Sequence, residues 1–151
     1  MATGRRMGSE LTDVIRYAND IIVPYYPKQI VIYVGENDLA YADSITPAIV
    51  LKRFETLFST IRSALPVVPI IFVSIKPSPS REKLMPEMVE ANKFIKQFLQ
   101  TKKKTVFVDV YDKMLDKEGK PMQDIFLEDN LHMNAKGYGI WQKILDPYLL
   151  K

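Results

Sequence analysis

The chain contains a single histidine, His132, which follows Asp129 by three positions in the segment Asp129-Asn130-Leu131-His132. A carboxylate at this spacing can hold one ring nitrogen of an imidazole, fix its tautomer and raise its basicity. We therefore predict that Asp129 and His132 form the acid–base half of a hydrolytic site. The other half is not apparent, because no nucleophilic side chain stands in a fitting sequence context.

Helices and strands alternate along the chain around these residues. Apolar side chains recur at helical spacing in four segments, which cover residues 11–22, 47–65, 88–99 and 134–147. Continuous apolar runs, rich in β-branched residues, predict buried strands over residues 29–34, 69–75 and 105–110. Alternation of this kind predicts a parallel α/β sheet with helices on both faces, in one domain over residues 1–151.

Local signals indicate where some helices begin and where loops intervene. Thr46 followed by Pro47 is typical of a helix start, and Asn134 can cap the last helix. Residues 76–80 (KPSPS) are too rich in proline for regular structure, and residues 118–128 also form a loop. We expect both loops to shape the pocket.

Three features fall beyond the carboxyl ends of the predicted strands, where open parallel α/β sheets bind their ligands. Gly35-Glu36-Asn37-Asp38 follows the first predicted strand, and Asp129-x-x-His132 follows the last strand and its loop. Gly8 stands just before the first predicted helix, with Ser9 beside it.

These segments resemble sequence blocks of the SGNH, or GDSL-type, hydrolases, a family of serine esterases. Gly35-Glu36-Asn37-Asp38 matches the G-x-N-D of the third block, and Asp129-x-x-His132 matches the D-x-x-H of the fifth. Residues 134–141, which read N-A-K-G-Y and end on a tryptophan, are also similar to many members. The segment from Gly8 resembles the second block, so the resemblance runs from about Gly8 to the end of the chain.

The resemblance implies a role for four residues. His132 would be the general base that takes the serine proton, and Asp129 would orient it. The side-chain NH2 of Asn37 and the backbone N–H of Gly8 would donate to the oxyanion. The implied fold is a three-layer, flavodoxin-like SGNH-hydrolase fold. The implied reaction is hydrolysis of short acyl esters, such as acetyl esters of carbohydrate or lipid, through an acyl-serine and without a cofactor or a metal.

The first block of the family, G-D-S, carries the nucleophilic serine and has no counterpart in this sequence. We expect the N-terminal strands of the fold to be missing, with the chain beginning at about the second block. Ser9 is better explained as a helix cap, and Ser74 lacks the sharp turn that would expose a nucleophile. Two alternatives to an active esterase remain: a catalytically inactive remnant that acts as a binding or interaction module, and half of a split hydrolase whose serine lies on another polypeptide.

The amino-acid composition limits the classes of partner that the chain is expected to bind. With 21 basic and 18 acidic residues, the net charge of +3 is too small to indicate nucleic acid, so a small-molecule ester is the expected partner. The absence of cysteine excludes disulfides and thiolate chemistry, and no apolar run reaches the roughly 18 residues of a membrane span. We expect a soluble protein, either cytoplasmic or exported by a signal outside this chain. No metal site is expected, because ligand spacing is lacking among Asp109, Asp112, Asp116 and Asp124.

The edge of the sheet is a further expected feature. In the flavodoxin-like strand order 2-1-3-4-5, the missing first strand would lie beside residues 29–34 (QIVIYV). That run would then leave one row of N–H and C=O groups unpaired, and apolar edges of this kind recruit further strands. We predict that the chain dimerises through this edge, pairs with a separate N-terminal fragment, or aggregates. Met1 to Gly8 do not resemble a strand, although folding back as one would cover the edge.

Overall fold

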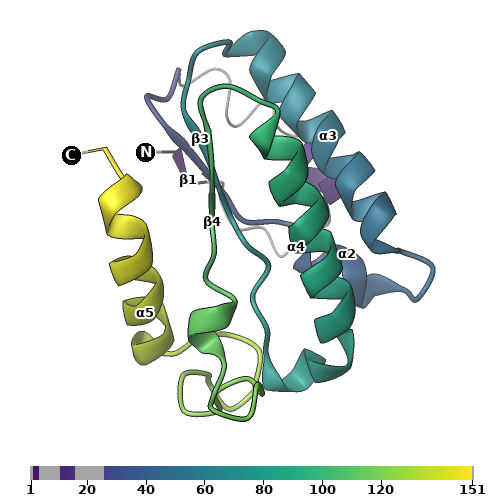
Figure 1. Cartoon of the computed structure of the whole chain (residues 1–151), viewed down its shortest axis with the longest axis vertical. Helices are drawn as coiled ribbons and strands as arrows, with labels where there is room; N and C mark the ends of the chain where they lie inside the picture. Colours follow the sequence, from purple (N-terminus) through teal and green to yellow (C-terminus); the bar gives the residue numbers. More distant parts are fainter. Residues whose placement is uncertain (1, 4–10, 16–25, 151) are drawn as a thin grey trace.

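The structure is a computed structural model that describes residues 2–3, 11–15 and 26–150. Residues 16–22 of the first predicted helix, together with Gly8 and Ser9, lie outside the described residues. Four parallel strands form one sheet in the order β1-β2-β3-β4 (Figure 1). They are β1 (Ala2–Thr3), β2 (Ile30–Ile32), β3 (Ile70–Val73) and β4 (Thr105–Val108).

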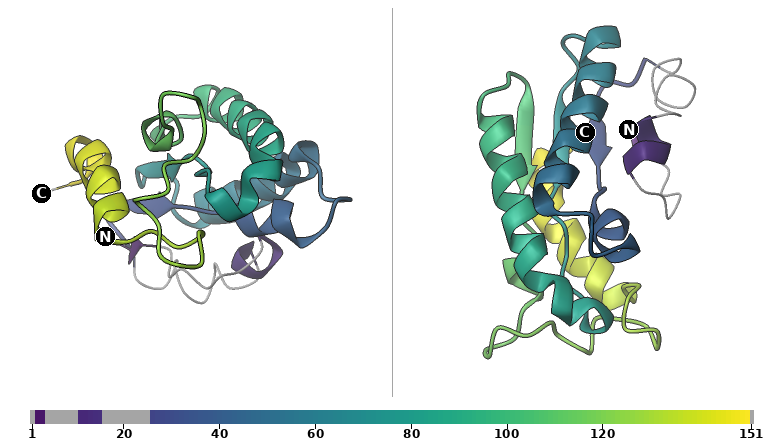
Figure 2. Two further views of the ribbon diagram at one scale, coloured as in Figure 1. Left: turned by 90° about the horizontal axis from the view of Figure 1, so that it is seen from below. Right: turned by 90° about the vertical axis from the view of Figure 1, so that its right-hand side faces the viewer.

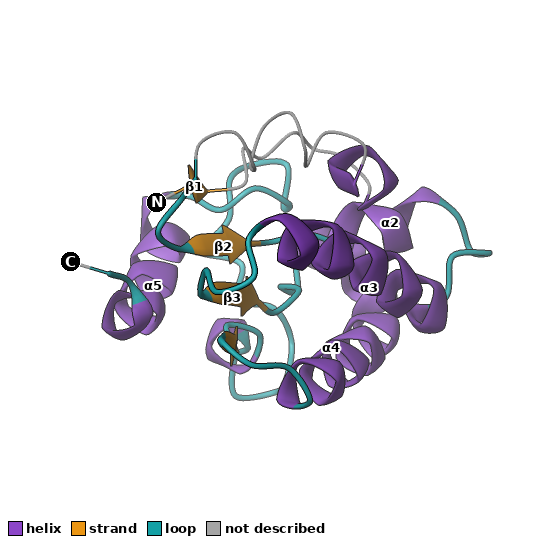
Figure 3. Ribbon diagram, turned by 90° about the horizontal axis from the view of Figure 1, so that it is seen from above, coloured by secondary structure: helices purple, strands orange, loops and turns teal. Residues whose placement is uncertain are grey.

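Helices cover both faces of the sheet, which confirms the predicted three-layer α/β fold. Helices α3 (Pro47–Ala64) and α4 (Met85–Gln100) lie on one face, and α5 (Ala135–Leu145) lies on the other (Figure 2). Residues 11–15 are helical and pack on the same face as α3. The short helix α2 (Glu36–Tyr41) follows β2 and lies beside α3 (Figure 3). Shorter helical turns are η2 (Pro79–Leu84), η3 (Asp112–Met114) and η4 (Asp146–Tyr148).

Two predicted helix starts are confirmed by their capping bonds. At the start of α3, Oγ1 of Thr46 accepts a hydrogen bond from the N–H of Ile49 at 3.3 Å. At the start of α5, Oδ1 of Asn134 accepts from the N–H groups of Lys136 and Gly137 at 2.9 and 3.1 Å. These bonds satisfy donors that every helix leaves unpaired in its first turn, so the local sequence fixes where both helices begin.

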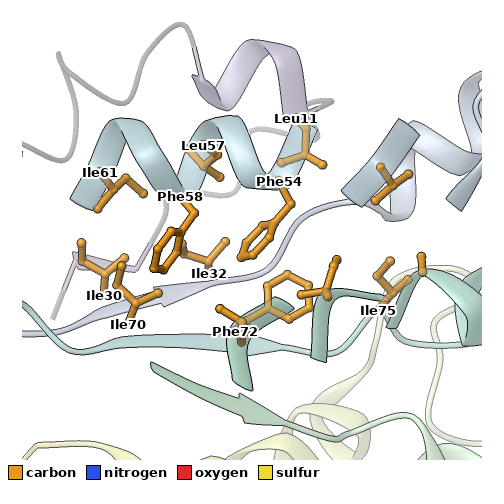
Figure 4. Packing of buried hydrophobic residues seen from close by; sticks show 14 of the residues in the cluster. Leu11, Ile30, Ile32, Phe54, Leu57, Phe58, Ile61, Ile70, Phe72 and Ile75 are labelled. Atoms are coloured by element: carbon orange, nitrogen blue, oxygen red, sulfur yellow. The ribbon is translucent and has the colours of Figure 1, made fainter. Parts of the chain in front are cut away.

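Alternation along the strands divides the apolar side chains between two cores. Ile30, Ile32, Ile70 and Phe72 face α3, where the ring of Phe72 lies 5.0 Å from that of Phe54 between centroids (Figure 4). On the other face, α5 covers a smaller cluster that includes Val31, Val73, Val110, Met114 and Trp141. Each large apolar side chain contributes about 1.5–3 kcal/mol when buried, so the smaller cluster is what holds α5 and the turn before it on the sheet.

Strand β1 corrects the prediction that the first eight residues do not resemble a strand. Ala2 pairs with Ile30 and Thr3 pairs with Val31 in parallel register. The strand therefore lies beside β2, in the place that the flavodoxin-like order gives to the first strand. Two residues are too few for a hydrophobic period, so the pattern of the sequence contains no signal for this strand.

Two other segments also differ from their predictions. The strand predicted over residues 29–34 is shorter in the structure, where β2 covers Ile30–Ile32. Gly35 then adopts a φ of 104° and turns the chain into α2, which the pattern does not predict. Residues 76–80, predicted to be irregular, lead into η2 at Pro79. Among the described residues, no helix is both long and apolar enough to cross a membrane.

Candidate active site

The loops that follow β2, β3 and β4 lie at the carboxyl-end edge of the parallel sheet, and those after β3 and β4 reach the lower end of the molecule in Figure 1. Residues 35–38 begin α2 there, residues 76–80 follow β3, and residues 129–132 precede α5. Hydrogen bonds from Lys76 join the first of these segments to the last. The structure thus brings the G-x-N-D and D-x-x-H segments to the same edge of the sheet.

The segment that carries Asp129 and His132 is a closed turn that precedes α5. The N–H of Leu127 donates to the carbonyl of His132 at 2.8 Å, and the N–H of Asn130 donates to the carbonyl of Leu127 at 2.9 Å. Asn130 adopts a φ of 57°, a left-handed conformation that asparagine tolerates better than most residues. This turn fixes the backbone of both predicted site residues.

Asp129 holds His132 through both of its carboxylate oxygens. Oδ2 lies 2.6 Å from Nδ1 of His132, and Oδ1 accepts from the N–H groups of Leu131 and His132 at 2.9 and 3.0 Å. The hydrogen bond from the His132 ring, followed by the two backbone donors, lowers the pKa of Asp129 from 3.8 to about 2. An ionised carboxylate only accepts, so Nδ1 carries the proton and Nε2 is the basic nitrogen of the neutral ring. Both side chains are half exposed, which leaves the ring accessible to a substrate.

Asn37 lies in the first turn of α2, where Arg81 contacts its amide. Nη1 of Arg81 donates to Oδ1 of Asn37 at 3.0 Å. Arg81 follows Ser80, whose N–H donates to the carbonyl of Asn130 at 3.0 Å. Asn37 and the turn that carries His132 are therefore connected through residues 80 and 81.

Asp38 is fully buried and links two segments that are distant in sequence. Its Oδ1 accepts from the N–H of Leu11 at 2.8 Å, and its Oδ2 accepts from Nη1 of Arg53 at 2.7 Å. Asp38 therefore has a structural role, because its carboxylate ties the helical residues 11–15 to α2 and α3. Gly8 precedes Leu11 by three positions and is itself outside the described residues.

Glu36 is the centre of a buried network of charges that the sequence pattern does not reveal. Its carboxylate accepts from the hydroxyl of Tyr33, contacts Nζ of Lys76 at 3.2 and 3.3 Å, and accepts from Nη1 of Arg81 at 2.8 Å. Burial, reinforced by Glu36, raises the pKa of Tyr33 well above 10.0, while burial lowers the pKa of Lys76 against the opposing effect of Glu36. Glu36 occupies the variable position of G-x-N-D, and Lys76 and Arg81 lie 40 and 45 positions away, so spacing carries no signal for these two partners.

Lys76 extends this network to the D-x-x-H turn. Its Nζ donates to the carbonyl of Leu131 at 2.9 Å and lies 5.5 Å above the centroid of the Phe126 ring. Residues from both loops predicted to shape the pocket, 76–80 and 118–128, therefore meet at this edge. The carbonyl of Leu131 directly precedes His132, so the position of Lys76 bears on the position of the imidazole.

Ser74, considered as a substitute nucleophile, is part of the sheet. It is fully buried after β3, and its Oγ accepts from the N–H of Val110 at 2.9 Å and lies 3.4 Å from Oδ1 of Asp109. Because these bonds join neighbouring strand ends, the hydroxyl is committed to structure. Ser9, the other serine considered, lies outside the described residues.

Two of the scattered aspartates, Asp109 and Asp112, do come together after the end of β4. The hydrogen bond and charge of Asp109 raise the pKa of Asp112. The pair borders a groove of about 300 Å³ between α4 and β4, whose other wall includes Lys93 and Lys96. Among residues 2–3, 11–15 and 26–150, no group of three or more acidic, histidine or cysteine side chains is placed to hold a metal ion.

The family assignment follows from a match over most of the chain. The sequence model of the GDSL-like Lipase/Acylhydrolase family matches residues 2–140. The chain belongs to this family. Membership confirms the resemblance drawn from G-x-N-D and D-x-x-H and makes the chain, by family, a carboxylic ester hydrolase. Among curated proteins, no sequence matched the chain.

Solved structures of similar fold include several esterases. A Streptococcus pneumoniae protein whose description names a platelet activating factor is 20% identical, with a TM-score of 0.82 over 95% of this chain and 69% of its own. A carbohydrate esterase of family 3 from Talaromyces cellulolyticus is 18% identical, with a TM-score of 0.76 over 93% and 66%. An acetyl-xylooligosaccharide esterase from Geobacillus is 14% identical, with a TM-score of 0.75 over 95% and 69%. At these identities the comparison concerns the fold alone, and the TM-scores confirm the fold of a GDSL-type hydrolase.

Proposed function

We propose that Asp129, His132 and Asn37 supply the general base and an oxyanion donor of a site that hydrolyses acyl esters. The observation that carries the proposal is the 2.6 Å contact between Oδ2 of Asp129 and Nδ1 of His132. With Nδ1 engaged, Nε2 would take the proton of an attacking serine hydroxyl and return it to the leaving alcohol. Nδ2 of Asn37 and the backbone N–H of Gly8 would donate to the oxyanion, each contributing a factor of about 10² to 10³ in rate.

Short acyl esters, above all acetyl esters of carbohydrate or lipid, are the proposed substrates. A carbohydrate esterase and an acetyl-xylooligosaccharide esterase are among the proteins of similar fold. The side chains of Asp129 and His132 are half exposed, which suits an open site. In such a site the acyl group can be small while the alcohol is as large as a sugar chain.

The sequence contains no G-D-S block that would supply the nucleophilic serine. Ser74 is not a substitute, because its hydroxyl accepts a hydrogen bond from the N–H of Val110 within the sheet. We therefore do not expect triad-like rates from the chain alone, since removal of a triad member leaves only weak residual catalysis. A second polypeptide with a G-D-S block would complete the site. Without one, the same surface would bind an acyl ester rather than hydrolyse it.

Hydrolysis of p-nitrophenyl acetate, with His132→Ala as the matched variant, tests the proposal. The chain alone should give a slow rate that His132→Ala leaves unchanged, and a fluorophosphonate should not label it. The polypeptide encoded directly upstream of Met1, if it carries G-D-S after an apolar strand, should raise the rate with the wild-type chain and not with His132→Ala. Fast hydrolysis with covalent labelling of the chain alone would contradict the missing nucleophile and point to a serine such as Ser9.

The edge of the sheet is the second part of this proposal. The pairing of β1 with β2 spans Ile30 and Val31, so the ladder at this edge is short. A second copy of the chain, or a separate N-terminal fragment, would extend it with further backbone hydrogen bonds. Size-exclusion chromatography with light scattering should show a dimer or a complex. A monomer with one cooperative thermal transition would contradict this part and leave the hydrolase proposal intact.

A further inference from the structure

We infer that Arg81 is a positioning residue for Asn37: it holds the amide oxygen and turns the amide N–H groups away, toward the place where an oxyanion would form. The inference rests on the proposed oxyanion role of Asn37. Nη1 of Arg81 lies 3.0 Å from Oδ1 of Asn37 and 2.8 Å from Oε2 of Glu36. Arg81 belongs to neither the G-x-N-D nor the D-x-x-H segment, so the family motifs assign it no task.

The chemistry of the guanidinium decides which way the amide faces. Arginine only donates hydrogen bonds, so only the oxygen end of the Asn37 amide can bind it. The oxygen and nitrogen ends of an amide have nearly the same shape, and hydrogen-bond partners select between the two orientations. In the wrong orientation, Oδ1 would present lone pairs to the developing negative charge. Holding Oδ1 with a cation therefore excludes the orientation that would oppose an oxyanion.

Arg81 is itself held in place by a buried carboxylate. The side chains of Arg81 and Glu36 are 19% and 8% exposed, so water competes weakly for their ion pair. Glu36 is fixed in turn by the hydroxyl of Tyr33 and by Nζ of Lys76. Charge-assisted hydrogen bonds of this kind are short and directional, so the guanidinium presents Nη1 to Asn37 from a fixed position.

The same carboxylate reaches the other half of the site. Lys76, which contacts Glu36, donates to the carbonyl of Leu131 at 2.9 Å, directly before His132. Glu36 thus contacts Asn37 indirectly through Arg81, and it contacts the turn that carries His132 through Lys76. Of these two cations, Arg81 is the one that acts on the orientation of the oxyanion donor.

A simple ion pair between Arg81 and Glu36 is the competing explanation, and the side-chain amide of Asn37 distinguishes the two. A cation on Oδ1 strengthens the partial double bond between Cγ and Nδ2, which slows rotation of the NH2 group. Nuclear magnetic resonance of the 15N-labelled full chain measures this rotation as exchange between the two amide protons. The signals of Asn37 are assigned by their loss in Asn37→Asp.

Arg81→Met removes the donor and keeps much of the volume of the side chain. The rotation rate of the Asn37 amide should rise by at least about threefold, with Arg81→Lys in between because an ammonium is a single, less directed donor. Lys136→Met, which removes a cation from the exposed pair with Asp124, is the matched control and should leave Asn37 unchanged. Unchanged rotation in Arg81→Met would overturn the inference. If that variant fails to fold, unchanged rotation in Arg81→Lys would overturn it equally.

Titration with sodium acetate, which carries the carboxylate that acetyl ester hydrolysis releases, separates this inference from the proposed function. Acetate should shift the Nδ2 signals of Asn37 and the ring signals of His132, and it should bind at least about tenfold more weakly to Arg81→Met. An acetate response that Arg81→Met leaves intact, with rotation also unchanged, would overturn the positioning role and support the site. Altered rotation without any acetate response in the wild type would support the positioning role and contradict the oxyanion site.

Discussion

The carboxylate of Asp38 accepts a hydrogen bond from the backbone N–H of Leu11 at 2.8 Å, across 27 positions of sequence. Leu11 begins the described helical residues 11–15, and Asp38 lies in α2 directly after Asn37. Both residues are fully buried. This bond gives the aspartate of G-x-N-D a structural role. Its carboxylate ties the helix that follows Gly8 in sequence to the helix that carries the proposed oxyanion donor.

Asp38→Ala should destabilise the fold strongly. The change leaves the N–H of Leu11 without its acceptor in a buried place and removes the carboxylate that faces Arg53. We expect a loss of about 3 kcal/mol in the free energy of unfolding, measured by urea denaturation. Asp124→Ala, which removes an exposed pair with Lys136, should change stability little. Equal effects of the two variants would show that the Asp38 bonds are dispensable.

The titration of Asp129 reports its contact with His132. Its pKa of about 2 lies below the ordinary 3.8, so any stabilisation from its ionised form is complete above the unfolded value and is lost as pH falls through about 2. In His132→Ala, the midpoint should rise toward 3.8. It should stop short of that value, because the backbone N–H groups of residues 131 and 132 still donate to Oδ1.

Carboxyl carbon chemical shifts measure this titration residue by residue. Asp124, whose pKa is lowered by the hydrogen bond from Lys136, is the internal control and should titrate alike in both proteins. An unchanged midpoint for Asp129 in His132→Ala would mean that the ring nitrogen does not donate to it in solution.

Glu36→Gln should be the most damaging change in the buried network. It keeps the shape of the side chain but leaves the buried ammonium of Lys76 without its carboxylate, at a cost of about 3–5 kcal/mol. Lys76→Met should cost less, because Arg81 still neutralises Glu36. The double variant should then cost less than the sum of the single changes by about 1 kcal/mol or more. Additive losses in urea denaturation would contradict a direct coupling between Glu36 and Lys76.

The pH dependence of Glu36→Gln follows from the lowered pKa of Lys76. Burial already lowers that pKa, and loss of the opposing carboxylate should lower it further. The folded variant would then release a proton that the unfolded chain keeps, so its stability should rise with pH. The deficit of Glu36→Gln relative to wild type should shrink as pH rises toward the ordinary lysine pKa of about 10.4. The double variant with Lys76→Met lacks the titrating group, so its own stability should not show this rise with pH.

Local signals predicted the elements, and contacts between distant residues account for what the sequence did not reveal. The caps at Thr46 and Asn134 are confirmed, because a capping bond depends on residues within three positions. The alternation of strands and helices is also confirmed, because the hydrophobic periods that predict it depend on residues a few positions apart. Strand β1 was not predicted, since its two residues have no period and are defined by their pairing with Ile30 and Val31.

The contacts of the candidate site likewise fall into those that are local in sequence, which were predicted, and those between distant residues, which were not. The hydrogen bond between Asp129 and His132 was predicted from a spacing of three residues, and the structure contains it. The network of Glu36, Lys76 and Arg81 joins positions 40 and 45 residues apart, which no motif spacing reports. The catalytic roles of Asp129, His132, Asn37 and Gly8 stay predictions, and Gly8 lies outside the described residues.

Gly137 and Gly139, two glycines of α5, should respond in opposite ways to alanine. A Cβ at Gly137 would lie 2.5 Å from the carbonyl oxygen of Ile125 and 2.9 Å from Cβ of Met133. The same carbonyl accepts a hydrogen bond from the N–H of Asn134, the residue that caps α5. The clash would therefore disturb the hydrogen bond that fixes the start of this helix. At Gly139, a Cβ would meet nothing within 4 Å among the described atoms.

Gly137→Ala should therefore lower the free energy of unfolding by about 1–3 kcal/mol through overpacking. Gly139→Ala should raise it by about 0.5–1 kcal/mol, because alanine loses less backbone entropy than glycine in a helix interior. Urea denaturation measures both, and the ring signals of His132 give a second measure. Met133 directly follows His132, so Gly137→Ala should shift those ring signals while Gly139→Ala should not. Two stabilising changes would mean that the start of α5 is looser in solution than its contact with Ile125 indicates.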